Sequence, residues 1–291
     1  MLSKRRYLWV LLLLPVITLG IVFKPLSVAY HWFYLTQLSP QTQRSSLQLS
    51  DYQVVIEAKP LAGIQRNLSG LTYNHHTNTL MGVTNRPTQA IELSPSGDVL
   101  RIIDLDNADD IEGISHIQGF EYVVISEGKN KAYWIDIQPE TPNVNVGESV
   151  KHAMNLSAFS NLGLEGADWD DSSQTLFMVQ EKWPMSIVTL NQQTQSQWKP
   201  KRSSALFMSD LASISISPPT QSLLLLSEES AVIAEYALSG ELLGMLPLWR
   251  GQHGLQHKVP QPEGLALGED GEIFVVSEPN LFYRFVRKGA V

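Results

Sequence analysis

Acidic side chains recur along this chain at two kinds of position, each tied to a short motif. In the first motif a glutamate is followed by glycine and an apolar residue, and its copies carry Glu112, Glu165 and Glu263. In the second, about fifteen residues further on, a glutamate ends an apolar run, and its copies carry Glu127, Glu181, Glu228 and Glu278. Weaker copies place Ser69, Ala212 and Asn85 in the remaining slots. A carboxylate that returns at the same place in each repeat predicts a cluster of carboxylates in the folded protein.

Such a cluster favours the binding of a hard cation. Carboxylates held together raise one another's pKa unless a positive charge compensates them. Ca²⁺ is suited to this role because it accepts six to eight oxygen ligands in a flexible geometry. The chain has no cysteine, and no histidine occupies these slots, which disfavours zinc and copper. We therefore expect a Ca²⁺ site with Glu112, Glu165 and Glu263 as leading ligands. The second series and Asn85 would serve as further ligands or as their supports.

Two other interpretations of the acidic series stay open. In one, the chain is a protein-interaction scaffold without metal. The glutamates then only hold neighbouring repeats together, by accepting backbone hydrogen bonds or pairing with Arg86, Lys129 and Lys182. In the other, the chain is a metal-assisted hydrolase of a lactone or a phosphoester, in which a metal-bound water attacks and one glutamate acts as base. A phosphoester would need more lysine and arginine at the site. No G-x-S-x-G, phosphate loop or H-E-x-x-H motif is present, so no catalytic residue is assigned and an enzyme is not favoured.

Two histidines are further candidates for contact with a partner. His253 and His257 belong to the long loop 249–262, which leads directly into the motif of Glu263. The loop is therefore expected to project at the same place as the acids. A periplasmic protein or a small molecule could bind there.

Short apolar strands separated by turn residues fill the chain from residue 51 onward. Successive copies of the first motif are 43 to 53 residues apart, and a propeller blade of four strands needs about 40 residues. This spacing predicts an all-β propeller of five blades, with six still possible, in which strand 52–58 completes the last blade. The innermost strand of a blade begins beside the end of the antiparallel second strand. Both acidic series should therefore meet at one mouth of the central channel.

The N-terminus has the pattern of a membrane anchor. Lys4, Arg5 and Arg6 precede an apolar stretch over residues 7–23, which is about the minimum length for crossing a bilayer. The basic residues should stay in the cytoplasm, so we expect a single-pass protein of the bacterial inner membrane whose remainder faces the periplasm. The expected division is an uncleaved anchor over 1–29, an interfacial aromatic segment and polar tether over 30–50, and the propeller over 51–288. A signal peptide cleaved near Ala29 is the competing interpretation.

Charge and composition exclude several classes of function. The chain has 291 residues, a formal net charge of −8 and a pI near 5.4, which argues against a nucleic-acid partner. The absence of cysteine excludes disulfides, thiolate metal sites and a cysteine nucleophile.

Three sequence stretches resemble the SdiA-regulated family, also called the YjiK/CarP family. They are residues 68–73, residues 164–169 and the closing run from Pro260 through Phe285, which reads PQPEG followed by VSEPNLFYRF. The likeness extends over about residues 50–286. It implies a β-propeller on the outer side of the inner membrane, linked in some members to calcium binding and calcium homeostasis. Members are also compared with phytase-like propellers. Ser69, Ala212 and Asn85 depart from the acidic pattern.

Overall fold

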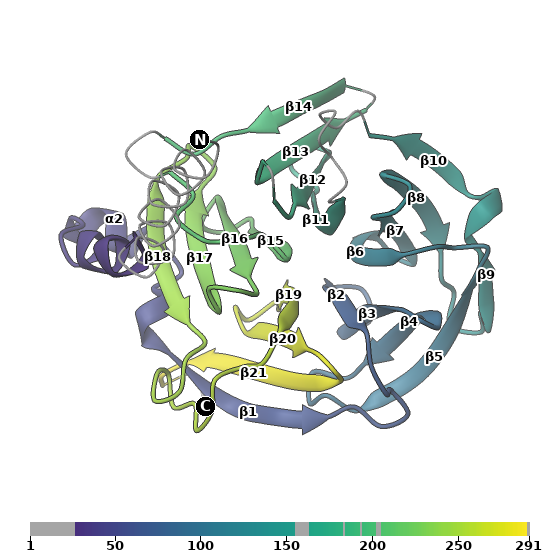
Figure 1. Ribbon diagram of the computed structural model, residues 1–291, viewed down its shortest axis with the longest axis horizontal. Coiled ribbons are helices and arrows are strands. Elements are labelled where there is room, and N and C mark those ends of the chain that lie inside the picture. The colour runs from purple at the N-terminus through teal and green to yellow at the C-terminus, as the bar shows by residue number, and fades with distance from the viewer. Residues whose placement is uncertain (1–26, 155–162, 183, 193, 202–204, 290–291) are drawn as a thin grey trace, which may run out of the picture.

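Five sheets stand around a central axis like the blades of a propeller, and all their strands pair antiparallel except the short β9 (Figure 1). The computed structural model describes residues 27–154, 163–182, 184–192, 194–201 and 205–289. Within these residues the sheets number five, so the five-blade prediction is confirmed and the alternative of six blades is wrong.

Each blade is a meander whose strands run outward from the axis. The first blade contains β2 (Leu68–Asn74), β3 (Thr79–Asn85), β4 (Thr88–Leu93) and β5 (Val99–Asp106). The second contains β6 (Ile111–Gln118), β7 (Glu121–Ser126), β8 (Lys131–Asp136) and β10 (Val150–Ala153). The third contains β11 (Leu164–Asp170), β12 (Thr175–Gln180), β13 (Ser186–Asn191) and β14 (Thr194–Trp198). The fourth contains β15 (Ser213–Ser217), β16 (Ser222–Ser227), β17 (Val232–Ala237) and β18 (Leu242–Pro247).

The fifth blade closes the ring with strands from both ends of the chain. It contains β19 (Pro262–Leu267), β20 (Ile273–Ser277), β21 (Leu281–Arg287) and β1 (Tyr52–Pro60). β1 pairs antiparallel with β21, from Tyr52 opposite Arg287 to Pro60 opposite Leu281. The predicted closure is therefore confirmed, and it removes two sheet edges that could otherwise pair with other chains.

The outer strand of the second blade is divided between two sheets. The sequence suggests one weak strand near residues 144–152. Instead, β9 (Asn143–Asn145) adds in parallel to β5 of the first blade, and only β10 pairs with β8. A short 3-10 turn, η2 (Val146–Glu148), joins them. Residues 143–153 thus connect the outer edges of the first and second blades.

The hydrophobic core lies between blades, because each blade is covered on both faces by its neighbours. In β16 every residue from Ser222 to Ser227 is buried, which explains its continuous apolar run. Leu224 and Leu226 of this strand pack in one cluster with Leu265 and Val275 of the fifth blade. Blade-to-blade burial of this kind holds the inner strands in place around the channel.

The segment before the propeller packs along the fourth blade. Residues 27–35 are helical, and α2 (Pro40–Arg44) and the 3-10 turn η1 (Leu49–Asp51) follow. The Leu47 backbone N–H donates to Glu235 Oε1 at 2.9 Å, and Arg287 Nη2 donates to the Leu47 carbonyl at 2.6 Å. The stretch expected to be a tether is therefore held to the fourth and fifth blades.

The predicted anchor over residues 1–29 lies almost entirely outside the described residues, which begin at residue 27. Among the residues that are described, no helix has the length and apolar character needed to cross a membrane.

Candidate functional site: an acidic channel mouth

The two acidic series meet at one end of the central channel. A cavity of about 290 Å³ opens there, lined by eight carboxylates together with Ser69, Asn85 and Ala212. The carboxylates are Glu112, Glu127, Glu165, Glu181, Asp210, Glu228, Glu263 and Glu278. All seven glutamates singled out in the sequence are thus brought together, as is Asn85.

A local irregularity of the innermost strands directs the first series toward the cavity. In β6, β11 and β19 the pairing with the second strand skips one residue, and the skipped residues are Glu112, Glu165 and Glu263. Such a β-bulge bends the strand and re-aims the side chain of the extra residue. β15 carries Ala212 just before it and shows no such shift. The bulge also occurs in β2, where Gly70 is skipped after Ser69, so it belongs to four of the five blades and three of these four place a glutamate on it.

The glycine after each of these glutamates allows the innermost strands to approach closely. A Cβ atom on Gly166 would lie 2.7 Å from Ser213 Cα of the next blade, and one on Gly113 would lie 3.0 Å from the Glu165 carbonyl oxygen. A Cβ on Gly264 would lie 2.8 Å from the carbonyl carbon of Gly70. These glycines therefore accommodate close approach of the backbone of neighbouring blades near the axis.

Two aspartates at the mouth belong to neither sequence motif and were not predicted. Asp110 and Asp210 each stand two residues before a member of the first series, at Glu112 and Ala212. In the fourth blade Asp210 supplies a carboxylate to the lining where Ala212 cannot. The signal that could have found both is an acid at the same offset, although only two of the five repeats carry it.

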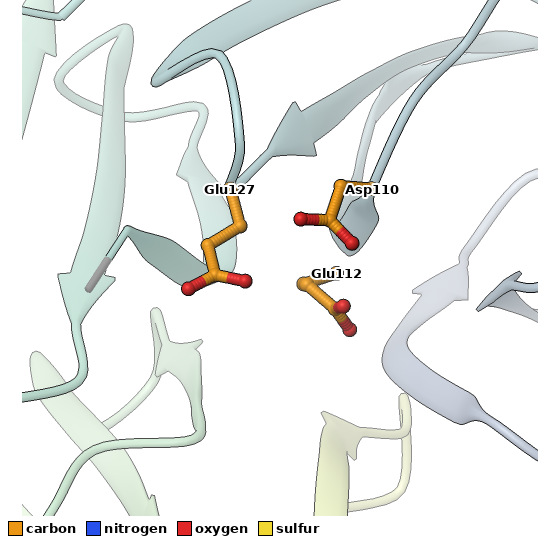
Figure 2. A group of neighbouring side chains, drawn as sticks. All are labelled: Asp110, Glu112 and Glu127. Atoms are coloured by element: carbon orange, nitrogen blue, oxygen red, sulfur yellow. The ribbon is translucent and has the colours of Figure 1, made fainter. Parts of the chain in front are cut away.

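Three carboxylates of the second blade converge most closely (Figure 2). Asp110, Glu112 and Glu127 each offer an oxygen, and these oxygens lie within 4.8 Å of one another. Within the described residues this is the one such group, and it does not include Glu165 or Glu263. Beside it, Asn85 Nδ2 donates to Glu112, while the buried Asn85 Oδ1 has no hydrogen-bond partner.

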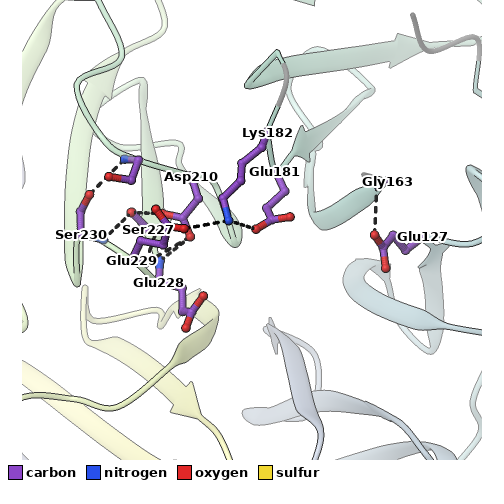
Figure 3. A network of polar contacts seen from close by, with 10 residues as sticks. Glu127, Gly163, Glu181, Lys182, Asp210, Ser227, Glu228, Glu229 and Ser230 are labelled. Atoms are coloured by element: carbon purple, nitrogen blue, oxygen red, sulfur yellow. Dashed lines mark hydrogen bonds and ion pairs between the residues drawn. The ribbon is translucent and has the colours of Figure 1, made fainter. Parts of the chain in front are cut away.

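Part of the acidic ring does hold blades together, as the stitching interpretation expects (Figure 3). Glu127 Oε1 of the second blade accepts a hydrogen bond from the Gly163 N–H at 3.1 Å. Lys182 Nζ contacts Glu181 at 2.7 Å and reaches Glu229 of the fourth blade at 3.0 Å. Although its partial burial alone would lower the pKa of Lys182, these two partners raise it, so the lysine stays charged.

Asp210 organises the loop that carries Glu228 (Figure 3). Its carboxylate accepts hydrogen bonds from the Ser227 hydroxyl and from the backbone N–H groups of Glu228 and Glu229, the latter two at 3.2 Å. Burial raises the pKa of Asp210 against these donors. This aspartate therefore has a structural role in addition to its place in the lining.

Two other carboxylates of the mouth have no such partners in the part of the chain that the structure describes. Among the described residues, no side chain and no backbone N–H donates a hydrogen bond to the carboxylate of Glu165 or of Glu263. Burial, followed by the charges of the surrounding acids, raises the pKa of Glu165 well above its usual value and that of Glu263 to about 8. Burial likewise raises the pKa of Glu112, Glu127 and Glu228. Around neutral pH the mouth holds more carboxylates than it can leave ionised without a cation.

The remaining candidates divide into two locations. Arg86 and Lys129 stay near the mouth, 3.9 Å from Asp110 and Asp109 respectively. The loop 249–262, in contrast, folds back along β1, where His253 Nδ1 lies 2.9 Å from the Tyr52 carbonyl oxygen and His257 Nδ1 3.9 Å from Glu57. Neither histidine lines the mouth cavity, so the expectation that they project there is wrong. The loop's apolar residues Leu255 and Val259 are buried, which draws it against the propeller.

The opposite end of the channel is organised around Asp168. Its carboxylate accepts hydrogen bonds from the Ile216 N–H at 2.7 Å, the Trp169 N–H at 3.0 Å, and the Ser115 and Ser215 hydroxyls at 3.2 Å. Burial raises the pKa of Asp168 to about 6. With this many donors from three blades, Asp168 joins the second, third and fourth blades at the axis.

Fold and site define a five-bladed β-propeller with an acidic channel mouth. The family model named SdiA-regulated matches residues 44–286, and the chain belongs to this family. Similar solved structures include a streptogramin B lyase, with a TM-score of 0.52, 11% identity and coverage of 81% of this chain and 98% of that one. A luciferin-regenerating enzyme matches with a TM-score of 0.50, 16% identity and 80% coverage of each chain. At these identities the two structures show a shared fold.

Proposed function

We propose that the acidic mouth binds Ca²⁺ and that the protein acts in calcium sensing or homeostasis. The observation that carries this proposal is the convergence of eight carboxylates on one small cavity, with the pKa of Glu263 raised to about 8. A cation that removed this repulsion would be bound at the expense of protons.

The residues present fit a calcium ion. Asp110, Glu112 and Glu127 would hold it, since their oxygens already lie within 4.8 Å of one another. Asn85 offers a buried carbonyl oxygen that lacks a partner. All four donors are oxygens, which is the ligand set that Ca²⁺ prefers. When bound, the ion would supply positive charge between the first and second blades. In this proposal Asp110 and Glu127 take the place of Glu165 and Glu263 as leading ligands, and Glu165 and Glu263 contribute negative charge across the channel.

The proposal is tested by thermal melting of the full chain, solubilised in detergent, in EDTA and across Ca²⁺ and Mg²⁺ titrations. A ligand that binds only the folded state stabilises it by about 2.7 kcal/mol at a hundredfold excess over Kd. We expect a rise in Tm selective for Ca²⁺, which Glu112→Gln/Glu127→Gln abolishes and Glu121→Gln leaves intact. Glu121 serves as the control because it is exposed at the opposite end of β7. No Ca²⁺-dependent shift up to millimolar concentration would refute the calcium site.

A hydrolase of lactones or phosphoesters receives less support from the same geometry. The basic residues near the mouth are each placed against carboxylates: Lys182 by Glu181 and Glu229, Arg86 by Asp110, and Lys129 by Asp109. Few cations are thus left to bind a phosphate. Turnover of a lactone or phosphoester that requires Ca²⁺ and the mouth glutamates would establish the enzyme instead. If neither Ca²⁺ binding nor turnover is found, the remaining hypothesis is a protein-interaction scaffold without metal.

We further propose that the protein is anchored in the bacterial inner membrane with its propeller in the periplasm. The support is the order of the N-terminal sequence, in which basic residues 4–6 precede apolar residues 7–23. Fractionation of cells and protease treatment of spheroplasts test this directly. A propeller that is protected from the protease, or released as a soluble protein, would contradict it.

A further inference from the structure

The helix over residues 27–35 turns aromatic side chains toward solvent. Tyr30 is 62% exposed, Phe33 64% and Trp32 38%. Tyr30 and Phe33 are three residues apart and so share one face of the helix. Phe33 and Trp32 also border a shallow groove of about 470 Å³ whose other walls are Ala29, Thr36 and Trp249. Exposed aromatic surface of this kind marks a site of contact with a partner or a membrane.

The other side of this helix is fixed to the propeller. Val28 is buried in the apolar cluster shared by the third and fourth blades, and the His31 ring stacks on Phe207 with ring centroids 4.5 Å apart. The ring centroids of Trp32 and Trp249 are 6.0 Å apart. Together with the hydrogen bonds at Leu47, these contacts give the aromatic face one orientation relative to the blades.

The helix is attached on the side of the propeller where the acidic mouth opens. Phe207 lies three residues before Asp210, which lines the mouth cavity. Trp249 donates from Nε1 to the Ser230 carbonyl at 3.0 Å, and Ser230 belongs to the loop that carries Glu228. The loops under the helix are therefore mouth-side loops of the fourth blade.

We propose that the aromatic face of Tyr30, Trp32 and Phe33 lies in the lipid surface, so that the acidic mouth is at the membrane-facing end of the propeller. This inference rests on the proposed anchoring. In the sequence, residues 24–26 lie between the apolar run and the first described helical residue, and three residues span at most about 10 Å. If residues 7–23 cross the bilayer, the helix lies within that distance of its boundary. Aromatic side chains are favoured at that depth, because their rings lie at the level of the lipid headgroups.

The consequence is a propeller held at a set angle, with the rim of the fourth blade against the bilayer. A loose tether would leave both ends of the channel equally distant from the lipid on average. A docked helix instead keeps the mouth close to lipid headgroups and to the outer surfaces of membrane proteins. The partner surface for the mouth is therefore a membrane surface.

The absence of native cysteine allows a direct test with single labels on the full chain. Glu229→Cys places a fluorophore on the mouth side of the fourth blade, and Pro219→Cys places one on the exposed turn at the other end of the same blade. Each protein is reconstituted into vesicles of phosphatidylethanolamine and phosphatidylglycerol with nitroxide headgroups as quenchers. We expect several-fold stronger quenching at position 229. Tyr30→Ser/Phe33→Ser should remove most of this difference, and Val150→Ser should not, although Val150 is 75% exposed on the second blade.

Three outcomes would overturn the inference. Equal quenching at the two positions, or stronger quenching at 219, in protein that floats with the vesicles would refute the orientation while leaving the anchoring intact. Protein that does not float with the vesicles would refute the anchoring itself. If the protein is a dimer in detergent and Tyr30→Ser/Phe33→Ser makes it a monomer, the aromatic face binds a second copy of the chain. None of these readouts depends on Ca²⁺, so the calcium proposal is tested separately.

Discussion

The carboxylates of the mouth differ in how their charge is compensated. Glu127 and Glu181 have a backbone donor and a lysine, respectively, at hydrogen-bond distance. Glu165 and Glu263 face neighbouring acids without a donor among the described residues. The first pair can stabilise the ring of blades without metal. The second pair destabilises it whenever both are ionised, and this difference gives the site a measurable dependence on pH.

Glu263 should make the metal-free protein less stable as the pH rises. Its pKa is about 8 in the folded protein against 4.5 ordinarily, so the folded state binds the proton more tightly. That stabilisation is fully present below about pH 4.5 and is lost progressively up to about pH 8. In EDTA, Tm should therefore fall between these pH values, and Glu263→Gln should flatten the fall. At pH 8 the variant should exceed the wild type by on the order of 1 kcal/mol or more.

The matched control for this prediction is Glu121→Gln, which removes an exposed acid far from the mouth. Its pH profile should follow that of the wild type. Saturating Ca²⁺ should raise the Tm of the wild type most at high pH. A wild-type profile in EDTA that rises from pH 5 to pH 8 would show that Glu263 does not titrate as described.

At the scale of the strands, the site depends on bulges and on glycines that bring innermost strands together. The bulged glutamate enters the cavity because the next residue, a glycine, lets its strand approach the neighbouring blade. The N-terminal segment is positioned by a different device, the buried Glu235 of β17. This carboxylate accepts from the Leu47 N–H and from the Ser222 hydroxyl, each at 2.9 Å. Burial raises its pKa to about 7 despite these donors.

Gly166→Ala should destabilise the propeller by about 1–3 kcal/mol, because its Cβ would lie 2.7 Å from backbone of the next blade. Gly119→Ala provides the comparison: its φ is +51°, yet a Cβ there meets nothing within 4 Å. If crowding at the axis decides the cost, the first change is the more harmful in chemical denaturation. A loss at Gly166 no larger than that at Gly119 would show that crowding at the axis does not decide the cost.

Glu235→Ala should release the N-terminal segment and lower the free energy of unfolding by about 2–3 kcal/mol, since it leaves buried donors without an acceptor. Hydrogen exchange at residues 46–50 should accelerate in the variant before global unfolding. Glu241→Ala is the control, because its contact with Lys201 is on the surface and contributes little. Unchanged exchange at Leu47 in Glu235→Ala would show that Arg287 alone holds the segment.

At the scale of the whole molecule, stability comes from closing the ring. Each blade buries both faces against its neighbours, so an open ring would expose two apolar faces at once. β1 prevents this by pairing along β21 from Tyr52 to Pro60. The carboxylates tend to push the blades apart at the mouth, and the closed ring opposes that repulsion.

Val54→Pro tests the closure. The Val54 N–H donates to the His253 carbonyl at 2.8 Å, and Val54 lies opposite Phe285 in β21. Proline removes this donor and constrains the strand. We expect a loss of about 1–3 kcal/mol, since the His253 carbonyl loses its donor, seen in calorimetry as a lower and broader transition. Val55→Pro, one residue on, removes a different N–H from the same strand and tests position dependence. Native-like melting of Val54→Pro would show that the ring does not depend on this part of β1.

The repeat architecture follows from local sequence patterns. Strand periodicity, turn residues and motif spacing predict five blades, the closing strand, and the meeting of the acids at one mouth. These features depend on antiparallel pairing between strands adjacent along the chain, which residue order largely specifies. The glycine after each glutamate recurs with the motif, but the backbone that it accommodates belongs to the neighbouring blade.

The contacts between blades and the path of the long segments were decided only by the tertiary structure. Which acids converge depends on the bulges and on blade packing, so Asp110 joins Glu112 and Glu127 while Glu165 and Glu263 do not. Loop 249–262 follows its buried Leu255 and Val259 to β1 rather than the motif it precedes. Residues 46–50 are held by Glu235 and Arg287, which lie about 190 and 240 positions away. Side-chain distances of a few ångströms between segments so far apart are set by packing, which no local pattern contains.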